Sequence, residues 1–220
     1  MAHLSNNNAA HLNKHFEQAY ALSGTSEAQT LYNEWAGAYD KDLDATGYAS
    51  PRRGVEAVIK NLSSASPDQL KILDAGCGTG LVGVSLAQSS LVGRFVLDGV
   101  DLSAGMLAVA RTKGMYQGLE TANLNERIDK LDGSYDVVLC VGTLTKGHVG
   151  PKVLAEFARL TAPSGLIVAT VLDEVYETGG FKAEIEQLRD GGAVQIVSTE
   201  EFGVLEEANT GGRMVVLKKI

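Results

Sequence analysis

The chain has 220 residues and a formal net charge of −8, with 45% hydrophobic and 21% charged residues. This size supports one domain with a sizeable core, and the acidic balance disfavours nucleic acid as a partner because it repels a phosphate backbone. No apolar run is long enough to span a membrane and the N-terminus lacks a signal-peptide pattern, so we expect a cytoplasmic protein without a membrane partner.

Residues 1–23 are polar and carry His3, His11 and His15 within a weak helical pattern. Because two histidines four residues apart often occur by chance, we expect a solvated helix face and no metal site. Cys77 and Cys140 are far apart and lack metal-ligand spacing. We therefore expect both to be small packing residues rather than a disulfide or a catalytic thiol.

A helix is predicted to begin near Ser26, which has capping-box spacing with Gln29, and to run through Trp35 to Tyr39. Its aromatic side chains fall on one helix face, so packing onto the domain is the simplest role for them. A second helix is predicted to begin at Ser50, with a proline in its first turn.

A glycine-rich turn follows the first predicted strand, which ends at Asp74. Gly76, Gly78 and Gly80 occupy alternate positions, and an apolar stretch at helical spacing begins at Leu81. Glycine permits a tight turn and lets a ligand lie against bare backbone beside the free amides of a helix N-terminus. A P-loop is excluded because no Gly-Lys-Ser/Thr follows, and the dinucleotide fingerprint places its third glycine one residue later.

The next predicted strand, 94–101, ends in the carboxylate of Asp101, about twenty positions beyond the glycines. A carboxylate there is placed to accept hydrogen bonds from two vicinal ribose hydroxyls. Asp101 and the glycine turn together predict a site for a nucleoside-type ligand. A nicotinamide-dependent oxidoreductase would share this ribose contact and remains an alternative, which the glycine spacing disfavours.

The rest of the chain alternates predicted strands and helices and closes with an antiparallel pair of strands. Strands are predicted within 114–124 and over 134–144, 166–171, 194–198 and 213–217, helices over 151–161 and 181–188, and a loop over 172–180. The run 134–144 is apolar almost throughout, as in a strand buried on both faces of a parallel sheet. Its carboxyl end, 140–145, is expected to open onto the ligand crevice.

Several motifs resemble those of class I S-adenosylmethionine (SAM)-dependent methyltransferases. Asp74 followed by G-x-G-x-G resembles motif I of that class, and D-L-S-x-G-M-L at 101–107 is typical of it. Further motifs are Y-x-x-W-A-x-x-Y-D-x-D-L at 32–43, G-Y-x-x-P at 47–51 and G-T-L-T-x-G-H-V-G-P at 142–151. These resemble the Williams-Beuren-region methyltransferase-like family and its fungal relatives, and the resemblance covers nearly the whole chain.

The resemblance implies an α/β fold, a Rossmann-like doubly wound sheet of about seven strands. The sheet is expected to be mostly parallel with an antiparallel C-terminal strand. Residues 1–68 are expected to form N-terminal helices and a cofactor lid, and residues 69–220 the class I methyltransferase domain, within one structural unit. A monomer or a homodimer is expected.

The resemblance also implies SAM as cofactor and S-adenosylhomocysteine (SAH) as product. Enzymes of this class often place an acidic residue after the third strand to bond the adenine amino group. Asn123 takes that place here, and its amide oxygen is able to accept the same bond. The predicted cofactor-binding residues are Tyr39, Asp74, Gly76, Cys77, Gly78, Gly80, Asp101, Leu102, Met106, Asn123, Leu124, Cys140 and Val141.

The acceptor is expected to be a small molecule methylated at an O, N or S atom, because the chain is acidic and compact and the aromatic lid is short. The predicted substrate-binding residues are Trp35, Thr143, Tyr176 and Phe181. His148 is either a general base or a loop histidine that caps the helix beginning near Pro151. An alternative function is a protein that binds SAM without transferring the methyl group.

Overall fold

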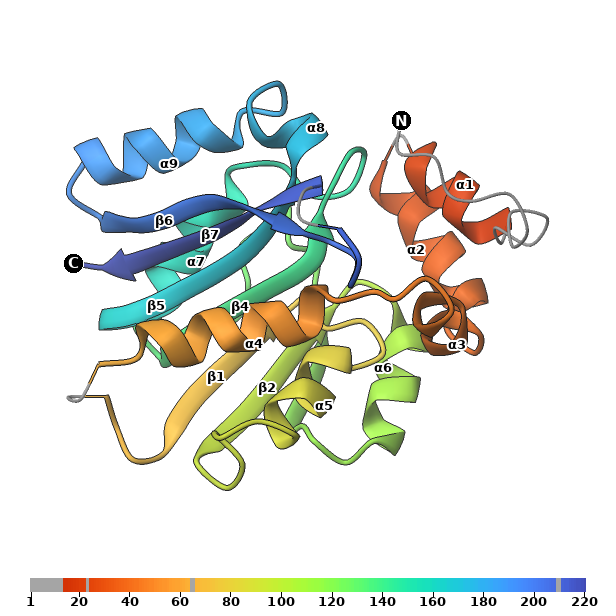
Figure 1. Ribbon diagram of the computed structural model, residues 1–220, viewed down its shortest axis with the longest axis horizontal. Coiled ribbons are helices and arrows are strands. Elements are labelled where there is room, and N and C mark those ends of the chain that lie inside the picture. Colours follow the sequence, from red (N-terminus) through yellow and green to blue (C-terminus); the bar gives the residue numbers. More distant parts are fainter. Residues whose placement is uncertain (1–13, 23, 64–65, 209–210) are drawn as a thin grey trace.

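The computed structural model describes residues 14–22, 24–63, 66–208 and 211–220 (Figure 1). The strands of these ranges are β1 (Leu70–Ala75), β2 (Phe95–Asp101), β3 (Gly118–Thr121), β4 (Tyr135–Leu144), β5 (Thr161–Leu172), β6 (Val194–Gly203) and β7 (Gly211–Lys219). They form one sheet in the order β3-β2-β1-β4-β5-β7-β6. The pairs from β3 to β5 are parallel, whereas β7 is antiparallel to both β5 and β6. The predicted fold class, including the antiparallel C-terminal strand, is confirmed.

Helices cover both faces of this sheet (Figure 1). The helices of the described ranges are α1 (Lys14–Tyr20), α2 (Thr25–Trp35), α3 (Tyr39–Asp44), α4 (Ser50–Asn61), α5 (Leu81–Ala87), α6 (Ala104–Thr112), α7 (Val153–Leu160), α8 (Asp173–Tyr176) and α9 (Phe181–Asp190). Apolar residues of α4 and α5 pack into the core on one face, and those of α7 and α9 into the core on the other. None of the helices in the described ranges combines the length and apolarity needed to cross a membrane.

The apolar run of β4 is buried on both faces, as its sequence predicts. Val137 and Leu139 belong to the core beneath α4 and α5. Val138 and Cys140 belong to the core beneath α7 and α9. Because successive side chains of a strand point to opposite faces, a strand in the centre of a two-faced sheet needs apolar residues at nearly every position.

The order of the strands indicates where a ligand crevice lies. β1 leads to β2 and β3 on one side, whereas β4 starts the series on the other side, so the order reverses between β1 and β4. Open α/β sheets bind ligands beyond the carboxyl ends of the strands at such a switch point. Helices α1, α2 and α3 gather at this end of the sheet (Figure 1), whereas α4 packs against β4 and β5 in the core.

The start of α2 differs from the prediction. The N-cap residue is Gly24, and no side chain caps the helix, so Ser26 and Gln29 do not form the predicted capping box. The Gln29 side chain instead donates a hydrogen bond from Nε2 to the carbonyl oxygen of Leu102 at 3.1 Å. A tertiary contact with the loop after β2 has thus replaced the local one.

Other boundaries differ for local reasons. The predicted helix through Tyr39 is interrupted, because α2 ends at Trp35 and α3 begins at Tyr39, with Gly37, a weak helix former, in the turn between them. The predicted loop 172–180 contains the short helix α8. The third strand, β3, is shorter than 114–124, and β5 begins before residue 166.

Candidate functional site

The glycine turn after β1 brings bare backbone to the crevice. Gly76, Gly78 and Gly80 have φ values of +75°, +52° and +91°, in the left-handed region that favours glycine. A Cβ at Gly76 would lie 2.3 Å from Oγ1 of Thr143, so the missing side chain allows the turn to approach β4. No atom lies within 4 Å of a Cβ position at Gly78, so a ligand is able to reach the backbone there.

Asp101, the last residue of β2, forms hydrogen bonds with the loop after β1 and with the loop after β2, which frame the crevice. Its Oδ2 accepts a hydrogen bond from the backbone N–H of Gly78 and its Oδ1 accepts one from Ser103, both at 2.8 Å. Burial raises the pKa of Asp101, and the backbone donors oppose that rise. A carboxylate oxygen has room for two hydrogen bonds, so each oxygen keeps one acceptor position for a ligand hydroxyl.

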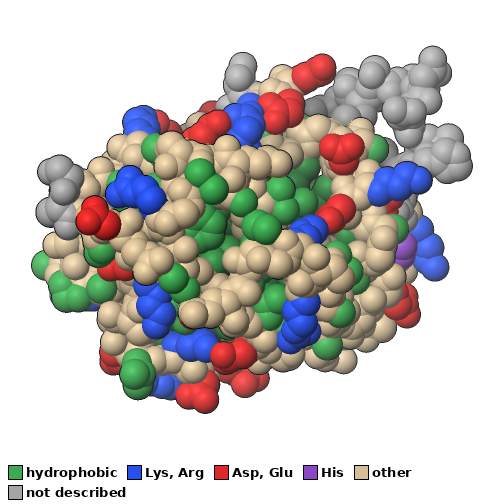
Figure 2. Space-filling view, turned by 90° about the horizontal axis from the view of Figure 1, so that it is seen from below, with side chains coloured by type: hydrophobic (Ala, Val, Ile, Leu, Met, Phe, Trp, Pro, Cys, Tyr) green, Lys and Arg blue, Asp and Glu red, His purple; other side chains and the backbone are tan. Residues whose placement is uncertain are grey.

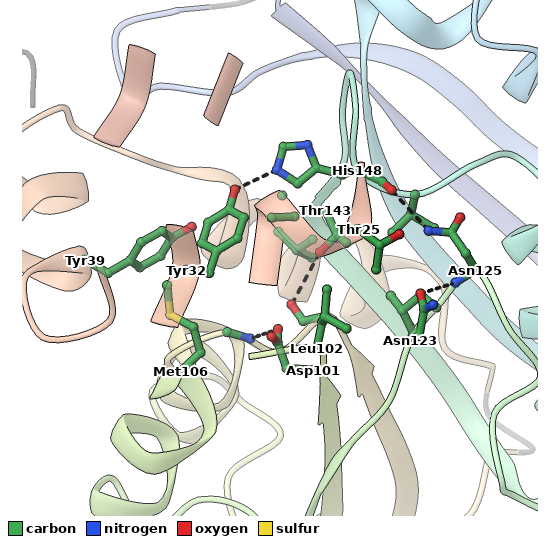
Figure 3. A pocket seen from close by; sticks show the side chains of 17 residues that line it. Thr25, Tyr32, Tyr39, Asp101, Leu102, Met106, Asn123, Asn125, Thr143 and His148 are labelled. Atoms are coloured by element: carbon green, nitrogen blue, oxygen red, sulfur yellow. Dashed lines mark hydrogen bonds between the residues drawn. The ribbon is translucent and has the colours of Figure 1, made fainter. Parts of the chain in front are cut away.

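A cavity with about 700 Å³ of space lies over the glycine turn and is called the first cavity (Figure 3). It is lined by most of the predicted cofactor-binding residues, namely Tyr39, Gly76, Gly78, Asp101, Leu102, Met106, Asn123, Leu124 and Val141. Thr143 and His148 also line it. The structure therefore brings these residues together, and their ligand contacts stay a prediction.

The remaining predicted cofactor residues, Asp74, Cys77, Gly80 and Cys140, do not line the first cavity. Gly80 is the N-cap residue of α5. Cys77 and Cys140 are buried and free of disulfides, and burial raises the pKa of both thiols. The side chains of Asp74, Cys77 and Cys140 are buried rather than exposed to the first cavity. Their predicted ligand contacts stay a prediction, and their observed role is to support the turn and the core.

Asp74 braces the glycine turn from behind. Its side chain is 1% exposed, and its Oδ2 accepts a hydrogen bond from the Tyr116 hydroxyl at 2.7 Å. The other oxygen, Oδ1, has no hydrogen-bond partner in the described part of the chain. Burial raises the pKa of Asp74 to about 7, although the bond from Tyr116 opposes the rise. The hydrogen bond between Tyr116 and Asp74 holds the turn in place, and the ionisable carboxyl group lies beneath the turn.

Helices α2 and α3 are attached to the loops around the first cavity. Oδ1 of Asn33, on α2, accepts hydrogen bonds from Ser103 Oγ at 2.7 Å and from the backbone N–H of Gly105 at 2.9 Å. Asp40, on α3, accepts a hydrogen bond from the hydroxyl of Thr79 in the glycine turn. Both helices are therefore held over the carboxyl ends of β1 and β2.

A second cavity, with about 680 Å³ of space, lies beside the first. Aromatic rings form much of its lining, namely those of Tyr20, Tyr32, Trp35, Tyr39, Tyr48 and Phe202. Tyr32, Tyr39, Gly142 and His148 line both cavities and form the shared wall. Of the predicted substrate-binding residues, Trp35 lines the second cavity and Thr143 the first.

Trp35 is held at the edge of the second cavity. Its ring meets that of Tyr39 edge-on, with ring centroids 4.8 Å apart, and its Nε1 donates a hydrogen bond to Asp42 Oδ2 at 2.7 Å. The ring of His15 stacks on Trp35 at 5.3 Å. Of the other N-terminal histidines, His3 and His11 lie outside the described residues. Within those residues, no group of His, Cys, Asp or Glu suits a metal ion.

His148 is hydrogen-bonded on both ring nitrogens, and Figure 3 shows the bond to Tyr32. Its Nε2 lies 2.8 Å from the Tyr32 hydroxyl, and its Nδ1 lies 2.7 Å from Thr145 Oγ1 and 2.8 Å from the carbonyl oxygen of Lys146. The alternative of a helix cap is wrong, because α7 begins at Val153 without a side-chain cap. Burial lowers the pKa of His148, which favours the neutral imidazole of a general base.

Two predicted substrate-binding residues lie away from both cavities, and their role stays a prediction. Tyr176 and Phe181 line neither cavity and are buried in the core beneath α7 and α9, with 7% and 2% of their surface exposed. The ring of Tyr176 also lies beneath the Arg213 guanidinium at 5.4 Å. The segment after β5 turns its apolar side chains inward, because α8 and α9 have to cover that end of the sheet.

Sequence reasoning missed Tyr32, the side chain that meets His148. It is the first residue of the motif at 32–43, and its three-residue spacing from Trp35 puts both residues on one helix face. That spacing was the available signal. Tyr48 and Asn125, which line the second and the first cavity respectively, were also missed. Tyr48 belongs to the G-Y-x-x-P motif at 47–51, which was the available signal, whereas nothing in the local sequence marks Asn125.

Comparison with known proteins gives an independent result. Residues 72–165 match the family model described as "Methyltransferase domain". Methyltransferase-like protein 27 of Homo sapiens is 35% identical over 153 residues, which cover 69% of this chain and 60% of that protein. The chain thus spans less than two thirds of the length of this curated relative.

Solved structures share the fold at low sequence identity. Magnesium protoporphyrin IX methyltransferase from Synechocystis PCC 6803, solved with bound SAH, has a TM-score of 0.59 and 17% identity, over 89% of this chain and 99% of that one. The [4+2]-cyclase SpnF has a TM-score of 0.62 and 14% identity, over 90% of this chain and 97% of that one. At these identities the likeness shows the fold alone.

Proposed function

We propose that the chain is a class I SAM-dependent methyltransferase, which its match to the methyltransferase-domain model and its human relative support, and that it transfers a methyl group from SAM to a small molecule bound in the second cavity. The observation that carries this proposal is the pair of adjoining cavities. They share a wall formed by Tyr32, Tyr39, Gly142 and His148. The acceptor atom has to contact the methyl group directly, so the proposal places donor and acceptor where the two cavities adjoin, beside these four residues.

The residues of the first cavity fit SAM. Each oxygen of Asp101 keeps an acceptor position that suits a ribose hydroxyl. Leu102, Met106 and Leu124 offer apolar surface to an adenine ring, and Gly78 leaves the backbone of the turn open. When bound, SAM supplies an electrophilic methyl group on a positively charged sulfonium.

The chain's own contribution to this chemistry is alignment and the exclusion of water. Helices α2 and α3 cover the crevice, and the hydrogen bonds of Asn33 and Asp40 hold them against the loops after β1 and β2. Positive charge on sulfur is lost during the transfer, so no developing anion has to be stabilised on the donor. Positioning of the acceptor in the second cavity is therefore the main requirement.

The second cavity suits a small, uncharged acceptor. Its lining, taken over the described residues, includes no Asp, Glu, Lys or Arg side chain. On the face shown in Figure 2, Lys and Arg side chains are scattered among Asp and Glu side chains instead of gathering in one patch. Together with the net charge of −8, this distribution favours a small molecule over nucleic acid.

The proposal is tested in two steps. Isothermal titration calorimetry with SAM and with SAH measures binding to the first cavity, and the absence of binding would overturn the proposal. The protein is then incubated with methyl-deuterated SAM and a library of small molecules, and mass spectrometry follows SAH and labelled products. The expected result is a labelled small molecule formed together with SAH. Labelling of macromolecules alone would contradict the proposed acceptor class.

A second candidate function is SAM binding without methyl transfer. The observation that favours it is the [4+2]-cyclase SpnF among the structural neighbours, because it shows that this fold also occurs in an enzyme named for another reaction. Binding of SAM without any release of SAH across the library would favour this second function over the first.

A further inference from the structure

The wall between the cavities contains a pair of side chains that suits proton transfer. Tyr32 and His148 are 116 positions apart in sequence, yet their hydroxyl and Nε2 atoms lie 2.8 Å apart. Both residues line both cavities. Figure 3 shows the Tyr32 hydroxyl directed at the His148 ring from the side of α2. The pair therefore stands where a donor in one cavity would meet an acceptor in the other.

The bonds on the far side of His148 determine which nitrogen carries the proton. A carbonyl oxygen only accepts hydrogen bonds, and that of Lys146 lies 2.8 Å from Nδ1. Nδ1 is therefore protonated, and Thr145 Oγ1 at 2.7 Å is a further partner of it. The lone pair of the neutral ring is then on Nε2, where it accepts the hydrogen bond from the Tyr32 hydroxyl.

The surroundings of Tyr32 favour its neutral hydroxyl over the phenolate. Burial raises its pKa, and the carboxylate of Asp101 and the hydroxyls of Tyr48 and Tyr20 raise it further. No Lys or Arg side chain lines either cavity in the described residues. Because a phenolate at Tyr32 is thus disfavoured, the hydroxyl has to gain one proton as it gives up another.

The second cavity indicates what molecule would supply that proton. Trp35 is buried beneath the stacked rings of His15 and Tyr32. The partly exposed rings of Tyr39, Tyr48 and Phe202 in the lining offer aromatic surface to a planar ligand. Ser50, Thr145 and Thr170 add hydroxyl groups to the lining. A neutral aromatic molecule that bears a hydroxyl group matches both features, since its ring packs on aromatic side chains while its hydroxyl meets polar ones.

We propose that Tyr32 and His148 form a proton relay for a neutral, hydroxylated aromatic acceptor in the second cavity. This inference rests on the proposed function. As the acceptor oxygen forms its bond to the methyl carbon, the carbon–sulfur bond breaks and its electron pair stays on sulfur. The acceptor's proton passes to the Tyr32 oxygen, and the Tyr32 proton passes to Nε2 of His148. The imidazolium then releases its proton to water, so one proton is liberated for each methyl group transferred.

The test compares phenol with 4-nitrophenol as acceptors. Phenol has a pKa of about 10, like tyrosine, and is neutral at mildly alkaline pH, whereas 4-nitrophenol is largely ionised and needs no base. For Tyr32→Phe and for His148→Gln, we expect kcat with phenol to fall by about 10²- to 10⁴-fold and kcat with 4-nitrophenol to fall far less. The proposal would be overturned if the variants lost the same activity with both acceptors or lost none with either. It would also be overturned if the wild type bound SAM but methylated neither phenol nor 4-nitrophenol.

A matched control is Tyr135→Phe. Tyr135 is the first residue of β4 and lies outside both cavities, and its hydroxyl donates a hydrogen bond to Asp98 on β2. We expect it to leave both rates unchanged. A readout that needs no turnover is nitrogen NMR of the labelled histidines, with the His148 signal assigned from His148→Gln. The expected state is a neutral ring with the proton on Nδ1, and Tyr32→Phe is expected to shift only the Nε2 signal. A proton on Nε2 would overturn the relay even where SAM binds, whereas failure of SAM to bind would overturn the proposed function.

Discussion

Replacement of Asp101 by Ala tests the cofactor site most directly. The side chain holds backbone donors from both loops, Gly78 and Ser103, at 2.8 Å. Each carboxylate oxygen keeps one acceptor position for the ligand. The variant therefore loses the two hydrogen bonds that SAM would donate. The N–H of Gly78 borders the cavity and is able to bind water instead, whereas Ser103 is buried and loses its acceptor.

The magnitude follows from these contacts. Hydrogen bonds to a charged group contribute about 1.5–3 kcal/mol, and part of that is offset because the burial that raises the pKa of Asp101 opposes its ionised form. We expect SAM to bind more weakly by about 1.5–3 kcal/mol in total, which is about a 10- to 150-fold rise in Kd.

The assay is isothermal titration calorimetry with SAM, supported by thermal unfolding to show that the variant is folded. The matched control is Asp98→Ala, three positions earlier on β2, whose carboxylate accepts a bond from Tyr135 and lies outside the first cavity. We expect that control to bind SAM like the wild type. Unchanged affinity in Asp101→Ala, or equal losses in both variants, would refute the assignment.

Other predictions concern the turn and the lid. Gly76→Ala is expected to lower the melting temperature in a thermal unfolding scan, because its Cβ would lie 2.3 Å from Oγ1 of Thr143 and φ is +75°; an unchanged midpoint would contradict the close packing. Asn33→Ala removes the hydrogen bonds that Asn33 accepts from Ser103 and Gly105. We expect it to weaken SAM binding by about 1–2 kcal/mol and to speed amide hydrogen exchange in α2. Unaltered exchange would argue against α2 being held over the crevice by these bonds. The pKa of Asp74 is raised from 3.8 to about 7, so its contribution to the free energy of unfolding is present at low pH and is lost as the pH rises through about 7. Urea unfolding is expected to show a loss of about 2.5 kcal/mol between about pH 5 and pH 8 that is absent in Asp74→Asn, and equal slopes in both proteins would contradict the buried, ionisable state.

Short-range patterns in the sequence determined much of the fold. The apolar runs of β1 and β4, the alternate glycines and the carboxylate at the end of β2 were all predicted and are found where expected. Such features depend on neighbouring residues. Glycine permits the turn, an apolar run forms a buried strand, and the carboxyl ends of parallel strands meet at one edge of the sheet. The first cavity was therefore largely visible from sequence.

Features that depend on packing were decided by the tertiary structure. Gln29 contacts Leu102 instead of forming a cap, and Phe181 is buried in the core and lines neither cavity. In both cases a distant partner outweighs the local pattern.

The meeting of Tyr32 with His148 spans 116 positions and required α2 to dock across the strand ends. A sequence pattern carries residue type and spacing, so it predicts strands, turns and the residues at their ends. Which side chains face each other across a cavity depends on how whole helices pack, and that is determined only when the chain is folded.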